Sequence, residues 1–227
     1  PDDHHLYASL GCAAENAVQA ARAAGFDAQV AFDAATDAVV VRLAPGVTEE
    51  TALFRAIPDR QCARSLYDGV QLPPETVRTL QGSAAGDGVD LVVMTERDAI
   101  RDMAGLVARG ARIQAADRAF VRELLAWIRF NEADAVATGD GLFSRATGNP
   151  STPRWLGRMA FLLTVRGSGE AAKAARQVSS SSGVAVIVTA ANDRAQRVAA
   201  GRACQRFALQ ATALGLRHAF VNQPVEV

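Results

Sequence analysis

The sequence is short of the residues from which catalytic and metal sites are most often built. It holds three histidines and three cysteines among 227 residues. The cysteines, Cys12, Cys62 and Cys204, are far apart and form no C-x-x-C pair, which argues against a disulfide framework and against a zinc site. Scattered, unpaired cysteines are typical of a reducing compartment, so we expect a cytoplasmic protein.

Excess charge of one sign and long apolar runs are missing as well. Lys plus Arg and Asp plus Glu are both 24, whereas domains that bind nucleic acid carry a basic surface. No stretch approaches the roughly 18–20 consecutive apolar residues of a membrane-spanning helix. We therefore expect neither a nucleic acid nor a membrane as a partner. Apolar residues make up 49% of the chain, enough for a substantial core.

Signatures of the common enzyme classes are also absent. The chain has no H-E-x-x-H, no Walker loop and no G-x-S-x-G, and no G-x-G-x-x-G follows a predicted strand. His4 and His5 stand at the start of the chain, and His218 is more typical of a packed or capping residue than of a ligand. We predict no catalytic side chain and no metal site.

The spacing of apolar residues predicts helices and strands in mixed order. Helices are expected over 10–24, 49–57, 74–81, 97–109, 115–130 and 194–214. Strands are expected over 28–32, 38–43, 89–94, 184–189 and 218–221, and residues 139–158 are expected to be loop. An order without regular βαβ alternation favours the α+β class.

Two segments resemble each other weakly. A small-residue helix begins at Gly11 and another at Gly201, and in each a second glycine follows fourteen positions later, before an apolar strand. Two unrelated alanine-rich helices with glycine caps would give the same pattern. The alternative is a pair of related half-units, the second more complete than the first.

The stretch "IPDRQCARSLYDGVQLPPE" is the best candidate for a binding site. It would place Arg60 and Arg64 one helical turn apart, and two guanidinium groups on one face suit a phosphate or an electron-rich ring oxygen. The alternative is a surface arginine pair bonded to carboxylates such as Asp59 and Asp68.

Polar and aromatic residues elsewhere give weaker signals. The amides of Asn222 and Gln223, at a predicted strand end, could meet the edge of a heterocycle, although an ordinary polar turn explains them equally well. Trp127 and Phe130 could stack on a planar ligand, but aromatic residues at helical spacing more often belong to a core.

Taken together, these stretches resemble the FMN-binding nitroreductase family, in particular its internally duplicated, Acg-like branch. "RQCARSLYDG" resembles the family's Arg-x-Ser-x-Arg segment, and "GRACQRFALQATALGLRHAFVNQPVE" resembles its long central helix with the strand that follows. "LYASLGCAAENAVQAARAAGF" is similar to the corresponding helix of a reduced first half. The resemblance implies a layered α+β fold, with a mixed, mainly antiparallel sheet flanked by helices around the central helix.

The resemblance also implies which residues contact FMN. They fall in the arginine segment, where Cys62 replaces the usual serine, and at the end of the last strand. The expected contacts are Arg60, Gln61, Cys62, Arg64, Phe220, Val221, Asn222 and Gln223.

The same resemblance implies a domain organisation. Residues 1–46 would be the remnant of a reduced first half-unit and 47–227 a more complete second one, together forming one globular unit. The family has further segments before the first helix and after the last strand, so we expect the flavin site of this chain to be incomplete. The partner would be a second copy of the chain, or the chain would form a pseudo-dimer by itself.

The implied activity is that of an FMN-dependent oxidoreductase. A hydride would pass from NADH or NADPH through flavin N5 to a small planar acceptor such as a nitroaromatic or a quinone. An alternative is a flavin-binding or flavin-sequestering protein without turnover, and a third is a scaffold that has lost its flavin.

Overall fold

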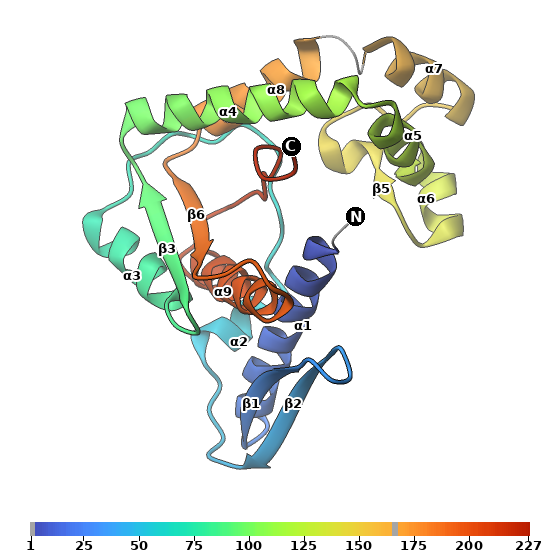
Figure 1. Cartoon of the computed structure of the whole chain (residues 1–227). Helices are drawn as coiled ribbons and strands as arrows, with labels where there is room; N and C mark the ends of the chain where they lie inside the picture. The colour runs from blue at the N-terminus through green and yellow to red at the C-terminus, as the bar shows by residue number, and fades with distance from the viewer. Residues whose placement is uncertain (1–2, 165–167) are drawn as a thin grey trace. The chain divides into compact units, whose positions relative to one another are not determined.

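The computed structural model describes residues 3–164 and 168–227 and confirms the α+β class (Figure 1). Helices account for 54% of the residues and strands for 16%. The contacts divide the chain into two compact units. Unit 1 comprises Pro1–Cys62, Leu72–Val93 and Ala185–His218, and unit 2 comprises Ala63–Gln71, Met94–Val184 and Ala219–Val227. Residues 1–46 lie wholly in unit 1, and the division into two related half-units stays a prediction.

Unit 1 is built around two long helices, one from each end of the chain. Its elements are α1 (His4–Ala23), β1 (Phe26–Asp33), β2 (Ala38–Pro45), α2 (Ala52–Ala56), α3 (Pro74–Ala84), β3 (Val89–Met94), β6 (Val184–Thr189) and α9 (Arg194–Ala213).

Unit 2 is mainly helical. Its elements are α4 (Arg97–Ala116), α5 (Arg118–Trp127), β4 (Ile128–Arg129), α6 (Glu132–Thr138), β5 (Leu142–Phe143), the short 3₁₀ helix η1 (Ser144–Thr147), α7 (Arg154–Thr164) and α8 (Ser168–Ser179). Within the described residues, none of the helices of either unit is both long and apolar enough to span a bilayer.

The strands of the described residues form three separate two-stranded sheets. β1 and β2 are an antiparallel hairpin with Val30 opposite Val41, β3 pairs with β6, and β4 pairs with β5 in parallel. The expectation of one mixed sheet is therefore wrong for this part of the chain. The strands predicted over 28–32, 38–43, 89–94 and 184–189 are present, but local pattern does not determine which strands pair.

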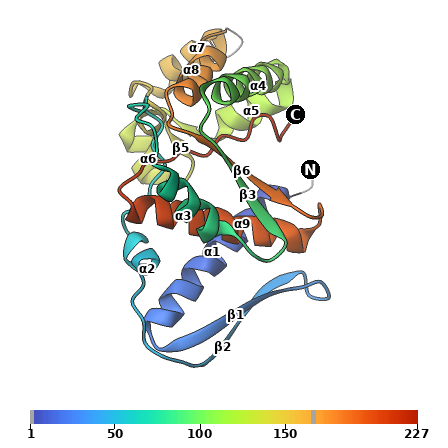
Figure 2. The same ribbon diagram turned by 90° about the vertical axis from the view of Figure 1, so that its left-hand side faces the viewer.

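Helices α1 and α9 cross in close contact, and this contact organises unit 1 (Figure 2). A Cβ atom added to Gly11 would lie 2.1 Å from the carbonyl oxygen of Val198. One added to Gly201 would lie 2.0 Å from the carbonyl oxygen of Ala8. Real Cβ contacts are never this short, so each helix needs a glycine where the other approaches.

The two glycines of the weak sequence repeat thus meet each other, since Gly201 Cα would lie 3.0 Å from a Cβ on Gly11. The second glycine of each repeat, fourteen residues later, also has the same structural role in both segments. Gly25 and Gly215 follow α1 and α9 with φ angles of 85° and 73°. Both are left-handed C-terminal caps, for which glycine is strongly preferred.

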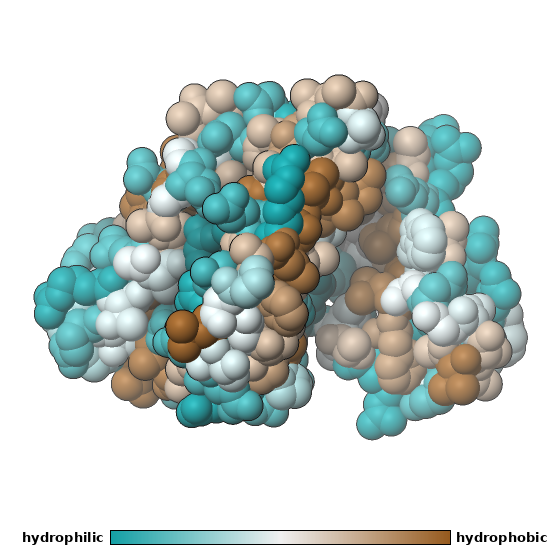
Figure 3. All heavy atoms as spheres, turned by 90° about the horizontal axis from the view of Figure 1, so that it is seen from below, coloured by the Kyte–Doolittle hydropathy of each residue, from teal (hydrophilic) through white to brown (hydrophobic). Residues whose placement is uncertain are grey.

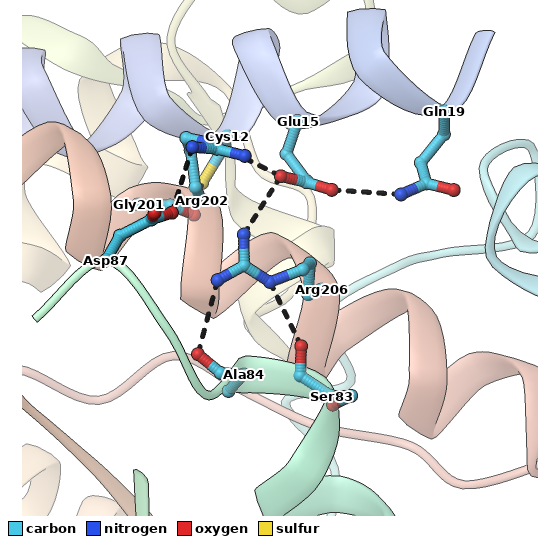
Figure 4. Close-up of polar contacts among 9 residues, drawn as sticks. All are labelled: Cys12, Glu15, Gln19, Ser83, Ala84, Asp87, Gly201, Arg202 and Arg206. Carbon is cyan, nitrogen blue, oxygen red and sulfur yellow. Dashed lines mark hydrogen bonds and ion pairs between the residues drawn. The ribbon is translucent and has the colours of Figure 1, made fainter. Parts of the chain in front are cut away.

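A buried ion network ties the same two helices together (Figure 4). Glu15 of α1 is 2% exposed. Its Oε2 accepts hydrogen bonds from Arg202 Nε at 3.2 Å and Arg206 Nη1 at 3.1 Å, both on α9. Its Oε1 accepts from Gln19 Nε2 at 2.9 Å. Both carboxylate oxygens therefore have partners, as a buried charge requires.

The arginines extend this network to the end of α3 and the turn before β3. Arg206 donates to the carbonyl oxygens of Ser83 and Ala84 at 3.0 and 3.2 Å. Arg202 also donates to Asp87 Oδ2 at 2.9 Å. The network around one buried carboxylate thus joins three segments that are far apart in the sequence: α1, residues 83–87 and α9.

Each unit has apolar core clusters of its own. In unit 1, Ala84, Val89, Leu91, Ala199 and Ala203 join α3 and β3 to α9. Unit 2 has one cluster around Ile100, Ala104, Val107 and Val178 of α4 and α8, and another around Val121, Leu125 and Phe130.

Large apolar side chains also reach the surface of unit 2, where Trp155 is 69% and Leu163 77% exposed. The molecular face in Figure 3 shows hydrophobic residues exposed among hydrophilic ones. Phe130 lies in a core cluster, which confirms the core interpretation of that residue.

The sequence pattern failed to predict the secondary structure mainly over residues 132–179. The expected loop 139–158 contains β5, η1 and the start of α7, and the helices α6 and α8 were not predicted. The boundary between α4 and α5 lies at Asp117, whose side chain accepts from Ala119 N as an N-cap. The expected strand over 218–221 is also wrong, because only His218 pairs, through one parallel bridge to Cys62.

We expect Gly201→Ala to destabilise the protein by at least about 2 kcal/mol, because the new methyl group would meet the backbone of α1. Urea unfolding measures the change. The matched control is Gly82→Ala in α3, where a Cβ has no neighbour within 4 Å. That variant should be neutral or more stable by up to about 1 kcal/mol. Equal stability of the two variants would contradict the close crossing.

Glu15→Ala should cost about 3–5 kcal/mol of unfolding free energy, because it leaves Arg202 and Arg206 partly buried without their carboxylate. The control is Glu49→Ala, which removes an exposed ion pair of 3.9 Å to Arg22. It should cost less than about 1 kcal/mol. If both variants lost the same small amount of unfolding free energy, Glu15 would not hold the two helices together.

Candidate functional site

The arginine segment after α2 is an irregular chain rather than a helix. Ile57–Asp59 form a turn, and no helix runs through 60–64. The prediction that Arg60 and Arg64 lie one helical turn apart is therefore wrong. Arg60 belongs to unit 1 and Arg64 to unit 2. Arg60 is half-buried and Arg64 is exposed. Pro58 restricts its own backbone and that of Ile57 before it, which helps to end α2.

Neither arginine is neutralised within the described residues. Neither guanidinium group has an ion pair there, and the carboxylates suggested as alternatives, Asp59 and Asp68, are not bonded to them. Asp68 instead accepts from the backbone of Val70 at 3.0 Å. The arginine segment thus keeps two cations available for a ligand.

In unit 1 the structure gathers Arg60, Gln61, Cys62, Arg217 and His218, which we call the Arg60 cluster. The parallel bridge between Cys62 and His218 joins the arginine segment to the residues that follow α9. His218 lies edge-on to Phe207, with ring centroids 6.4 Å apart. Its Nδ1 is buried and has no hydrogen-bond partner in the described part of the chain.

The electrostatics of the Arg60 cluster keep His218 neutral. Burial lowers the pKa of His218 below the ordinary 6.5, and the nearby positive charges of Arg60 and Arg217 lower it further. A neutral imidazole carries one donor and one acceptor nitrogen. The cluster therefore offers a cation next to a neutral, unpartnered ring nitrogen.

A hollow of about 680 Å³ adjoins these residues in unit 1, between α2 and the end of α9. Gln61 lines it together with Arg55, Asp59 and Arg217. Gln61 thus lines a surface that also carries two arginines and one aspartate, where its side-chain amide can donate or accept.

The predicted contacts at the other end of the chain, Phe220–Gln223, belong to unit 2. There the backbone of Gln223 lies against α4, because a Cβ on Gly110 would come within 2.6 Å of its carbonyl oxygen. The carboxylate of Glu226 accepts hydrogen bonds from the amides of Gln114 and Asn222. Gln223 Oε1 is buried and has no partner among the described residues.

The predicted contacts therefore fall into two groups, one in each unit. Sequence reasoning missed Arg217, and it treated His218 only as a packed or capping residue. The signal that could have drawn attention to both was the pair "RH", two residues after the glycine cap of α9. No group of three or more His, Cys, Asp or Glu side chains in the described ranges could hold a metal ion.

No family model matches the sequence. Two curated proteins of Mycobacterium tuberculosis are similar to it in sequence: "Putative NAD(P)H nitroreductase MT3217" of strain CDC 1551 / Oshkosh and "Putative NAD(P)H nitroreductase Rv3131" of strain H37Rv. Each is 27% identical over 236 residues, covering 100% of this chain.

The chain spans 64% of the length of these relatives. The matched region covers the whole chain, and the names of these relatives are in line with the predicted resemblance to nitroreductases.

Since the folded pKa of His218 is below the unfolded one, the unfolded state takes up the proton more readily. Protonation of His218 in the unfolded state should therefore lower the free energy of unfolding as pH falls through about 6.5. We expect the wild type to lose more unfolding free energy than His218→Gln between about pH 7.5 and pH 5. Urea unfolding across that range measures the difference. Parallel losses would show that His218 titrates in the folded state as it does in a free peptide.

Proposed function

We propose that this chain is the flavin-binding part of a nitroreductase-like, FMN-dependent oxidoreductase. The observation that carries the proposal is the similarity along the whole chain to two proteins named NAD(P)H nitroreductases. When bound, FMN would supply hydride transfer between NADH or NADPH and a small planar acceptor, such as a nitroaromatic or a quinone. The protein's part is to bind and orient it.

The Arg60 cluster fits a flavin phosphate or a polar ring edge. A phosphate needs cationic donors that no carboxylate already occupies. Within the described residues, no carboxylate is bound to Arg60. The unpartnered Nδ1 of His218 is a polar atom that a ligand could satisfy. Cys62, where the resemblance expects serine, offers only a weak donor, so Arg60, Gln61 and His218 would carry most of the binding.

In unit 2, the exposed guanidinium of Arg64 and the unpartnered Oε1 of Gln223 are the groups best suited to a flavin. A buried amide oxygen without a donor costs free energy, and a ring N–H would satisfy it. The contacts proposed for Phe220, Val221 and Asn222 rest on the resemblance alone.

The small number of histidines is consistent with this chemistry. Hydride transfer takes place on the cofactor, so no protein carboxylate or histidine need accept a proton in the central step. A cation such as Arg60 would instead stabilise the negative charge of the reduced ring. Self-pairing of the chain, either as a homodimer or as a pseudo-dimer, stays part of the proposal.

Arg60→Ala should weaken FMN binding roughly tenfold to hundredfold, because it removes charge-assisted hydrogen bonds of about 1.5–3 kcal/mol in all. Quenching of flavin fluorescence during titration of the protein into FMN measures the affinity. Arg60→Lys keeps the charge but loses the fork-shaped donor, so it should fall between the wild type and Arg60→Ala.

The matched control is Arg42→Ala, which removes an exposed arginine from β2 of the same unit. It should leave FMN affinity unchanged. Equal affinity of wild type and Arg60→Ala would place the flavin elsewhere, and no binding by the wild type would contradict the proposal for this chain. Tight FMN binding without reduction by either nicotinamide would favour the flavin-sequestering alternative.

A further inference from the structure

All three cysteines of the chain lie in unit 1, although 192 residues separate the first from the last. Cys12 is on α1, Cys204 is on α9, and Cys62 is in the Arg60 cluster. The α1–α9 crossing brings the first and last of them together. The flavin proposal gives Cys12 and Cys204 no role.

The two helix thiols meet at the closest point of the crossing. Cys12 directly follows Gly11, where the helix backbones touch, and its Sγ donates to the carbonyl oxygen of Gly201 at 3.2 Å (Figure 4). Cys204 is one turn further along α9. Side chains of a helix lean toward its N-terminus, so the Cys204 thiol leans toward Gly201 and Cys12. The two thiols lie close enough for each to affect the pKa of the other.

Their surroundings make one thiol the better nucleophile. The neighbouring Cys204 thiol holds the pKa of Cys12 below its ordinary value, and the charge of Arg60 adds to this effect. The neighbouring Cys12 thiol and burial raise the pKa of Cys204. Cys12 is only half-buried, so a small reagent can reach it. A thiolate is the reactive form of cysteine.

We propose that Cys12 and Cys204 form an oxidisable dithiol, which a hydroperoxide converts into a disulfide between α1 and α9. The Cys12 thiolate attacks the terminal oxygen of the hydroperoxide, the O–O bond breaks, and an alcohol or water leaves. The resulting sulfenic acid of Cys12 is then attacked by the sulfur of Cys204, the S–O bond breaks, and water leaves.

The electrons balance over the two steps. The two thiols lose two electrons and two protons in total, and the hydroperoxide gains both. A reducing dithiol reverses the reaction by thiol exchange. The inference does not depend on flavin binding, because it uses only the crossing of the two helices. Since no His, Cys, Asp or Glu group among the described residues suits a metal, these thiols are not proposed as ligands.

The test treats the reduced full-length chain with hydrogen peroxide near one equivalent. We expect two of the three thiols to disappear in a thiol titration under denaturing conditions, and the intact mass to fall by about 2 Da. Peptide mapping without reductant should join the Cys12 peptide to the Cys204 peptide. Dithiothreitol should restore all three thiols. The oxidised chain should unfold at a higher urea concentration, because the bridge closes a long loop.

The matched control is Cys62→Ser, which keeps both helix thiols and should form the same bridge. Cys12→Ser and Cys204→Ser should not form it, and wild-type peptide mapping decides the question even if these variants fold poorly. A bridge that includes Cys62 would overturn the proposal. So would sulfinic acid on Cys12 without a bridge, or three thiols that survive peroxide.

Discussion

The approach of α1 to α9 is the constraint on which unit 1 depends. Gly11 and Gly201 allow the two backbones to touch. Among the described residues, the guanidinium groups of α9 and Gln19 then replace water around the buried carboxylate of Glu15. These two requirements support each other. Without the close crossing, Arg202 and Arg206 could not reach Glu15, and without the ion network the crossing would bury an uncompensated charge.

Much of this fold could be predicted because its elements have strong local patterns. The strands 89–94 and 184–189 are valine-rich, and the glycines at 25 and 215 mark helix ends that the structure confirms. The region 132–179 was harder. Its helices expose apolar residues such as Trp155 and Leu163, so the apolar face that normally reveals a helix does not mark its buried side.

The candidate site could also be predicted only in part from the sequence. Residue types pointed to the arginine segment, and the structure leaves Arg60 and Arg64 without carboxylate partners among the described residues. Helical spacing between them could not be judged from sequence, because Pro58 and the single pairing of Cys62 with His218 set the local backbone. The environment of His218 depends on its sequence neighbour Arg217 and on Arg60 and Phe207, which only the fold brings to it.

On the function proposed above, the chain holds a flavin that nicotinamides can reduce. The most direct measurement is the visible absorbance of the FMN-loaded protein under anaerobic conditions while NADH or NADPH is added. The account predicts that the absorbance band of oxidised flavin disappears in proportion to the nicotinamide, and that it returns when a quinone or nitroaromatic is admitted. A protein that binds no FMN, or bound flavin that keeps its spectrum with both nicotinamides, would contradict it.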